Sequence, residues 1–217
     1  MSAGTARVTQ AFALTDAEIH ALDERGWFLR DGVLGHPAST GVHDAVEALA
    51  AAGRLRPAGL SRGAAYRVDA AARGDAIAWV EPDGVPLELA ALWAVFLALR
   101  DALNRDVYLG LDRVEVQVAR YPGGGTAYNR HRDAFPARPG GHPNRRVTAI
   151  YYANPGWCPE DGGALRLHGV ESPTDVAPVL DRLLVFLSER VEHEVLPVRV
   201  PRSAVTAWFR ARDPLGN

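Results

Sequence analysis

Six short segments with the alternating pattern of β-strands follow one another in the second half of the chain, and they restrict its possible folds more than any other feature. In the first segment three valines alternate with polar or small residues, which predicts one face toward an apolar core. Clusters of Gly, Pro and Asp separate the segments. Strands of this length and density are typical of a β-sandwich or a jelly-roll barrel. The six segments are 114–121, 146–152, 164–167, 183–187, 194–198 and 204–209.

Helices are predicted ahead of these strands. Thr15 and Glu18 have the spacing of a capping box and begin the first predicted helix. The last and most regular predicted helix has a wide apolar face that suits packing against a sheet. Because helices come first and strands second, we expect an α+β fold with N-terminal helices packed outside a β core. Helical patterns cover 15–26, 42–52 and 86–103, and further strands are expected at 27–30 and 77–80.

The chain length is compatible with a single domain over 1–217. Within it we expect a helical and β support region at 1–110 and the β core at 111–212. Residues 54–73 are basic, rich in small residues and weakly patterned. A segment of this kind is long for a plain connector and predicts a mobile lid or binding loop, although a solvated surface loop has the same composition.

Composition and charge exclude several classes of function. Apolar residues make up 47% and charged residues 23% of the chain, as in an ordinary folded protein, and the net charge of −2 gives no general attraction to nucleic acid or anionic membranes. The chain has no apolar run long enough for a membrane span, its first residues lack a signal-peptide pattern, and its one cysteine, Cys158, cannot form an internal disulfide. We therefore expect a cytoplasmic protein, monomeric or weakly dimeric, with no nucleic-acid or membrane partner.

A candidate metal site begins with His131 and Asp133, which end a strand-like run that starts at Tyr121. The two-residue period of a strand points both side chains to one face. The pair alone also fits a polar strand end. Among the other histidines His193 is the best third ligand, because it follows a buried-strand pattern and precedes a second apolar run. Two imidazoles and one carboxylate leave coordination positions open, which suits a ferrous oxygenase better than a closed zinc site.

Arg202 adds a second element to this site. It opens the last predicted strand and shares a face with Thr206 and Trp208. An unpaired arginine inside a β core is costly, and no acid in the neighbouring strands serves as its partner. A small dicarboxylate ligand would serve, held by Arg202 at one end and by the metal at the other, and the phenol of Tyr152 could share its carboxylate. The alternative is a surface salt bridge at a turn.

Several blocks of the sequence, in the same order, resemble the iron(II) and 2-oxoglutarate dependent oxygenases. The similarity is to the prolyl 4-hydroxylase branch, which includes the hypoxia-inducible-factor prolyl hydroxylases and bacterial relatives. It spans most of the chain. The blocks lie at 73–79, 119–133, 147–152, 162–167, 181–190, 193–195 and 202–209.

This resemblance implies a double-stranded β-helix core with Fe(II) bound by His131, Asp133 and His193. It also implies that Arg202 and Tyr152 bind the distal carboxylate of 2-oxoglutarate, in a pocket lined by Tyr121, Leu165 and Thr206. The implied reaction uses O2, with ascorbate as a stimulant, and hydroxylates a prolyl residue while 2-oxoglutarate becomes succinate and CO2. The protein's task in such a reaction is to hold cofactor and target in place.

The resemblance also implies residues that contact the substrate. Arg145 and Trp208 match positions that contact the target peptide in this branch. Tyr128 lies beside them, and Asp75 lies next to the loop 54–73. Segments 54–73 and 134–144 depart from the family pattern at the place where a substrate would be read.

The expected partner is a protein with a proline-containing loop, and elongation factor Tu is a candidate by analogy. A hydroxylase of free amino acids or other small metabolites is one alternative, and a catalytically silent sensor or binding domain is another. The joint presence of three ligands and Arg202 favours an active enzyme.

Overall fold

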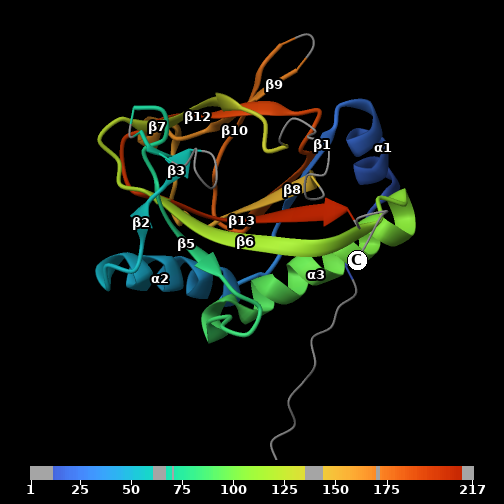
Figure 1. Cartoon of the computed structure of the whole chain (residues 1–217), viewed down its shortest axis with the longest axis horizontal. Coiled ribbons are helices and arrows are strands. Elements are labelled where there is room, and N and C mark those ends of the chain that lie inside the picture. The colour runs from blue at the N-terminus through green and yellow to red at the C-terminus, as the bar shows by residue number, and fades with distance from the viewer. Residues whose placement is uncertain (1–11, 61–66, 70, 135–143, 170–171, 212–217) are drawn as a thin grey trace, which may run out of the picture.

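A computed structural model describes residues 12–60, 67–69, 71–134, 144–169 and 172–211. Two antiparallel sheets face each other, and the long helices lie along the outer side of the larger sheet (Figure 1). Within the described residues, no helix combines the length and apolar character that a membrane span requires. The helices are α1 Asp16–Glu24, α2 Ala38–Ala51 and α3 Ala90–Val107, with 3-10 turns η2 Leu87–Leu89 and η3 Pro159–Asp161.

Among the described residues, the larger sheet has seven strands, the smaller sheet has four, and two further strands form a ribbon. Every strand pair is antiparallel. In spatial order the larger sheet contains β1 Trp27–Asp31, β11 Arg182–Leu187, β8 Arg145–Tyr152, β13 Arg202–Ala211, β6 Leu111–Tyr121, β5 Ala76–Val80 and β2 Arg56–Pro57. The smaller sheet contains β10 Thr174–Val176, β9 Leu165–His168, β12 Glu192–Val198 and β7 Thr126–His131, and the ribbon is β3 Gly59–Leu60 with β4 Arg67–Val68.

The larger sheet separates two apolar clusters. On its outer face Val116 and Val118 of β6 pack in one cluster with Leu92 and Phe96 of α3. A second cluster fills the space between the sheets and contains Ile150, Phe186, Leu165, Val195 and their neighbours. Full burial of each such side chain contributes about 1.5–3 kcal/mol, so both faces of the central strands stabilise the fold.

The predicted α+β class is confirmed, and each predicted helix and strand is present with shifted ends. Helix α2 begins at Ala38, four residues before the predicted start, because Pro37 is tolerated where a helix begins and needs no hydrogen-bonded N–H. Strand β10 and the two-residue strands β2 to β4 were not predicted, since they are too short to show a period. The predicted loop 54–73 contains β2 to β4, and its residues 61–66 and 70 lie outside the described residues.

Candidate functional site

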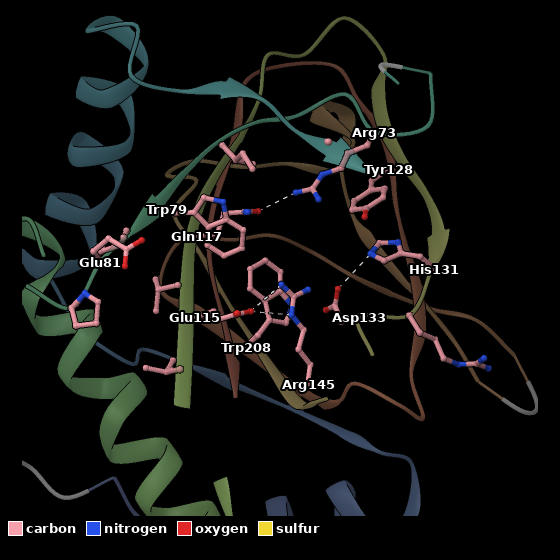
Figure 2. Close-up of a pocket in the computed structure, with 17 residues that line it drawn as sticks. Arg73, Trp79, Glu81, Glu115, Gln117, Tyr128, His131, Asp133, Arg145 and Trp208 are labelled. Carbon is pink, nitrogen blue, oxygen red and sulfur yellow. Dashed lines mark hydrogen bonds and ion pairs between the residues drawn. The ribbon is translucent and has the colours of Figure 1, made fainter. Parts of the chain in front are cut away.

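A cavity of about 820 Å³ opens between the two sheets, and we call it the outer cavity (Figure 2). A narrower inner cavity continues from it, deeper between the sheets. Both cavities are bordered by His131, Asp133 and Trp208. The two cavities therefore meet at the residues that the sequence predicts as metal ligands.

The glycine run between β6 and β7 delivers the first ligand to this junction. Gly123, Gly124 and Gly125 all have positive φ, which favours glycine, and a Cβ at Gly123 would lie only 2.8 Å from the carbonyl oxygen of Arg199. The tight turn carries the chain from the larger sheet to the smaller one. Strand β7 then runs to His131, which pairs directly with His193 of β12.

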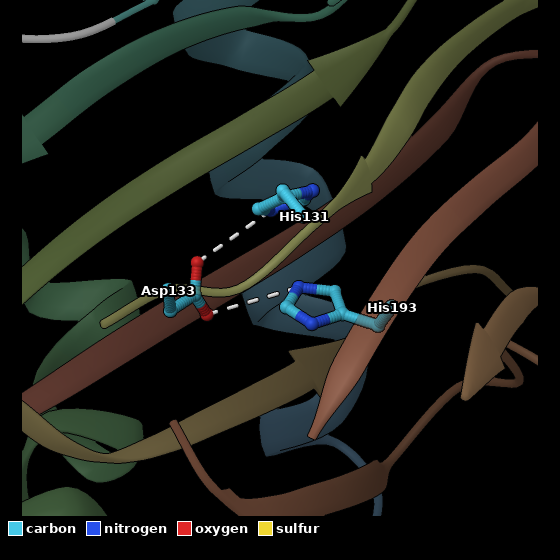
Figure 3. A group of neighbouring side chains, drawn as sticks. All are labelled: His131, Asp133 and His193. Carbon is cyan, nitrogen blue, oxygen red and sulfur yellow. Dashed lines mark ion pairs between the residues drawn. The ribbon is translucent and has the colours of Figure 1, made fainter. Parts of the chain in front are cut away.

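His131, Asp133 and His193 point toward one another (Figure 3). His131 Nε2 lies 3.6 Å from Asp133 Oδ1, and His193 Nε2 lies 3.8 Å from Asp133 Oδ2. One ligand atom from each residue can be chosen so that all three lie within 4.8 Å of one another. Asp133 follows the end of β7 instead of continuing it, so a bend in the backbone, in addition to strand alternation, brings it to the two imidazoles.

The backbone fixes which nitrogen of each imidazole faces the carboxylate. His131 Nδ1 lies 2.8 Å from the carbonyl oxygen of Asn129, and His193 Nδ1 lies 3.4 Å from that of Val191. When Nδ1–H donates to these carbonyls, each Nε2 keeps a lone pair directed toward Asp133. Burial lowers the pKa of His193 to about 4, against the opposing effect of Asp133, so this ring is neutral at physiological pH.

Asp133 is held as a carboxylate by its surroundings. Burial alone would raise its pKa, but the nearby His193 and His131 outweigh that effect and hold the pKa well below its ordinary value. Thr148 Oγ1 donates to Asp133 Oδ2 at 2.8 Å, and Ser188 Oγ lies 2.8 Å from Thr148 Oγ1. Because the threonine hydroxyl has one proton and gives it to the carboxylate, Ser188 must be the donor to Thr148. A buried relay of two hydroxyls therefore orients the carboxylate.

The donor set fits a divalent metal ion. Two neutral imidazole nitrogens and one carboxylate oxygen are the combination that non-haem Fe(II) sites use, and three protein ligands leave positions for other ligands. The junction of the two cavities gives such ligands access from both sides.

Arg202 lines the inner cavity, and the buried Tyr152 lies against it. Arg202 Nε donates to the carbonyl oxygen of Gly163 at 2.8 Å, and its guanidinium carbon lies 5.2 Å from the ring centre of Tyr152. In the described part of the chain, no acidic side chain forms an ion pair with Arg202. The Tyr152 hydroxyl is buried without a hydrogen-bond partner, and burial raises its pKa to about 12, which keeps its proton. A carboxylate ligand would satisfy both groups.

The three residues predicted as pocket walls also border the inner cavity. Tyr121 is buried against Arg202, with 5.2 Å between its ring centre and the guanidinium carbon. Leu165 faces it from the smaller sheet, and Thr206 lies four residues, or two strand periods, after Arg202 on β13. The structure thus brings together the predicted ligands, the predicted arginine and tyrosine, and the three wall residues.

Three of the four residues predicted to contact a substrate line the outer cavity. The guanidinium carbon of Arg145 lies 3.8 Å from the Trp208 ring centre, and the Tyr128 ring stacks on His131 at 3.8 Å. The indole Nε1 of Trp208 is buried and has no hydrogen-bond partner in the part of the chain that the structure describes. Asp75 does not line this cavity. It is buried and pairs with Arg73 Nε at 2.7 Å, so it positions Arg73 at the cavity wall.

Several lining residues were missed by the sequence prediction. Gln117 accepts from Arg73 NH2 at 3.0 Å, and strand alternation with Tyr121 would have placed it on the cavity face. Trp79, on the neighbouring strand, lies 5.7 Å from Trp208 between ring centres. The roles of Thr148 and Ser188 follow from contacts between distant segments, and no local pattern indicates them. Of the segment 134–144, which departs from the family pattern, residues 135–143 lie outside the described residues.

Comparison with known proteins places this site in a family. Residues 116–210 match the model of the 2OG-Fe(II) oxygenase superfamily. Human prolyl hydroxylase EGLN3 is 34% identical over 200 residues, which cover 88% of this chain and 81% of the human protein. The structure of a prolyl-4-hydroxylase from Pseudomonas putida has 36% identity and a TM-score of 0.79, over 90% of this chain and 98% of that one.

A second structure extends this comparison. The prolyl hydroxylase of Trichoplax adhaerens, solved with a peptide from the oxygen degradation domain of hypoxia-inducible factor, has 32% identity and a TM-score of 0.75. The match covers 89% of this chain and 87% of that one. The chain therefore belongs to the prolyl hydroxylases of the 2OG-Fe(II) oxygenase superfamily, whose cofactors are Fe(II), 2-oxoglutarate and O2.

Proposed function

We propose that this protein hydroxylates a prolyl residue of a partner protein, with Fe(II), O2 and 2-oxoglutarate, and releases succinate and CO2. The observation that supports this most directly is the position of the three ligands. They lie between an outer cavity of about 820 Å³ and an inner cavity lined by Arg202, whose neighbour Tyr152 has a buried hydroxyl without a hydrogen-bond partner among the described residues. One cavity suits a small dicarboxylate and the other suits a segment of polypeptide.

In this proposal the ligands and pocket residues act as predicted from the sequence. His131, Asp133 and His193 bind the iron, and Arg202 and Tyr152 bind the distal carboxylate of 2-oxoglutarate. When bound, iron and 2-oxoglutarate supply the activation of O2 that oxidises a C–H bond. We also propose that the two facing sheets form the double-stranded β-helix of this family, as a single domain over residues 1–217.

The protein's own contribution to this chemistry is positioning. The Thr148 and Ser188 hydroxyls fix the Asp133 carboxylate, and the backbone carbonyls fix both imidazoles. Tyr152 keeps its proton and can donate it to a carboxylate in a hydrogen bond. The apolar walls of the inner cavity exclude water, which strengthens each of these polar contacts.

The outer cavity suits an extended polypeptide better than a free amino acid. Its volume exceeds what one small ring needs and lies in the upper part of the range for ligand pockets. The Tyr128 ring, stacked on His131, offers an apolar surface for the target proline beside the metal site. The buried Nε1–H of Trp208 lacks an acceptor, and a backbone carbonyl of a bound peptide could supply one. Arg145, which lies against Trp208, borders the same position.

We propose as partner a protein with a proline-containing loop, for which elongation factor Tu is a candidate by analogy, and a cytoplasmic enzyme that is a monomer or a weak homodimer.

The decisive experiment compares a proline-containing loop peptide with free proline as substrate. The enzyme is incubated with Fe(II), 2-oxoglutarate and each compound, and both the mass gain of one oxygen and the succinate formed are measured. We expect hydroxylation of the peptide with matching succinate. Hydroxylation of free proline alone would identify a small-molecule enzyme, and succinate formation that no added compound stimulates would contradict both assignments.

A further inference from the structure

We propose that the end of the outer cavity away from the metal ligands binds a lysine or arginine side chain of the protein substrate. The binding groups are the carboxylate of Glu81 and the ring of Trp79. This proposal rests on the proposed function and adds a rule for substrate choice to it: the partner segment carries a positive charge at a fixed distance from the target proline.

The local backbone places both side chains in the outer cavity. Val80, the last residue of β5, packs in the cluster under the helices, so strand alternation directs Trp79 and Glu81 to the opposite side. Both residues line the outer cavity, and Figure 2 shows Glu81 on the side away from His131 and Asp133. The Gly84 N–H donates to the carbonyl oxygen of Glu81 at 3.0 Å, which closes a turn and fixes where the side chain begins.

Glu81 differs from the other acidic residues of the cavity. Glu115 pairs with Arg145 at 3.3 Å and with Arg210 at 2.9 Å, and Asp133 accepts from Thr148. The exposed side chain of Glu81 forms no hydrogen bond or ion pair with any residue of the described ranges. Among the acidic residues that line the described part of the cavity, Glu81 is therefore the one whose negative charge has no partner.

The basic residues of the lining do not neutralise this charge. Arg73 is engaged with Asp75 and Gln117, and Arg145 is engaged with Glu115 and the Trp208 ring. Arg132 lies next to the ligand Asp133 in the chain, and its charge acts on Glu192 of the smaller sheet. The end of the cavity near Glu81 thus keeps a negative charge that a cationic side chain can complement.

Trp79 adds an aromatic surface next to this charge. Trp79 is 47% exposed, which is high for a tryptophan in a cavity wall. Its ring extends the aromatic surface of Trp208. Trp208 already has the guanidinium of Arg145 against its ring. A cation over the face of tryptophan within about 6 Å is attracted by the ring, and a carboxylate beside it adds to the attraction. An apolar side chain could cover Trp79, but it would displace water from the Glu81 carboxylate without giving that carboxylate a new hydrogen bond or ion pair.

The test uses one proline-containing peptide in which lysine is moved through successive positions on both sides of the proline, with alanine and glutamate versions at each position. At the best position we expect kcat/KM for the lysine peptide to exceed that for the alanine peptide about tenfold at low salt, and less at high salt. Glu81→Gln should remove most of this preference. Glu81→Lys should reverse it in favour of the glutamate peptide.

Glu88→Lys is the matched control, because Glu88 is exposed on η2 and does not line the cavity. It makes the same change of charge and should retain the preference for lysine. The affinity for 2-oxoglutarate should be the same in all variants, which confirms that they are folded. A preference for lysine that persists in Glu81→Gln, or equal turnover of all peptides by the wild type, would overturn the proposal.

Binding of the same peptides, labelled with a fluorophore and measured by anisotropy, separates this inference from the proposed function. If no peptide is hydroxylated, prolyl hydroxylation is the wrong assignment. The anisotropy then still tests the cation site. If the wild type binds the lysine peptide more tightly than the alanine peptide and Glu81→Gln does not, the cation site is supported. If the wild type binds both peptides equally, the cation site is refuted.

Discussion

The inner and outer cavities share a border but are built in opposite ways. In the inner cavity, Asp133, His193 and Arg202 are buried and are held by neighbours from several strands. In the outer cavity, the lining includes exposed residues such as Glu81 and Trp79, and its paired charges lie nearer to solvent. The inner cavity is thus fixed by the protein core, whereas the outer cavity is shaped by surface side chains.

This difference matches two different tasks. The same cofactor binds in every turnover, so a rigid site with few unpartnered polar groups is sufficient. The side chains of such a site are already ordered when the protein folds, so cofactor binding does not have to order them. A protein substrate is recognised by differences in charge and shape, which exposed residues can supply with little effect on the core. Substitutions in the inner cavity should therefore affect cofactor and metal binding strongly, and those in the outer cavity should affect peptide binding alone.

The largest effect is expected for Asp133→Ala, which removes one of three ligands. Fe(II) affinity should fall by more than about a hundredfold, beyond the 10–100-fold effect typical of losing an outer-shell partner, and 2-oxoglutarate turnover should be lost with it. Metal content after dialysis and succinate formation measure the two effects. Asp175→Ala is the control, because Asp175 pairs with Arg166 on the surface. Metal binding unchanged in Asp133→Ala would disprove the ligand assignment.

Arg202→Met should have the next largest effect. A buried charged pair costs about 3–5 kcal/mol when one partner is removed, so 2-oxoglutarate affinity should fall at least about a hundredfold, while Fe(II) affinity changes little. Calorimetric titration measures the affinity, and Arg166→Met, which alters a half-exposed arginine of β9, should match the wild type. Equal loss in both variants would place Arg202 outside the cofactor site.

Thr148→Val tests whether the hydroxyl relay orients Asp133. The substitution conserves shape but removes the proton donated to Oδ2, so Fe(II) affinity should fall about 10–100-fold. Thr148→Ser keeps the hydroxyl and should recover most of the affinity. Ser188→Ala, one step further along the relay, should have a smaller effect. The same loss for valine and serine would indicate a packing defect instead of a lost hydrogen bond.

Tyr152→Phe should change the stability of the protein in opposite directions with and without 2-oxoglutarate. The Tyr152 hydroxyl is buried without a partner, so its removal should leave the free energy of unfolding unchanged or raise it by about 1 kcal/mol when 2-oxoglutarate is absent. With 2-oxoglutarate the variant should be less stabilised than the wild type, and the affinity should fall about tenfold. Thermal unfolding at several cofactor concentrations shows both effects. A variant destabilised in the absence of cofactor would contradict the unpartnered hydroxyl.

The sequence predicted the inner cavity well because burial leaves a regular pattern. Strand alternation placed Arg202 and Thr206 on one face, and the apolar runs around His193 placed it at the core. An arginine in such a place needs a partner, so the carboxylate ligand could be inferred without coordinates. The structure brings these residues together as that reasoning required.

The outer cavity was predicted less completely, because its residues are brought together by long-range contacts. Asp75, which is predicted to contact the substrate, borders the inner cavity and pairs with Arg73. The network with Gln117 joins segments more than forty positions apart in sequence. Trp79 lies in a short strand, and Glu81 directly follows it; the partner of this strand in the sheet cannot be derived from local pattern. Exposed residues leave little periodic signal in the sequence. The position of the Glu81 carboxylate beside Trp79 in the outer cavity can therefore be recognised only from the structure.

The smallest effect is expected for Arg145→Gln, in the outer cavity. Arg145 is braced by Glu115 and lies against Trp208, so the loss of its charge should leave the sheets intact and alter only the surface that a peptide contacts. We expect KM for the peptide to rise about fivefold, as for one contact among several at an interface, with the affinity for 2-oxoglutarate unchanged. Steady-state kinetics with peptide and cofactor varied separately distinguishes the two. A loss of cofactor affinity in this variant would show that the two cavities are energetically coupled.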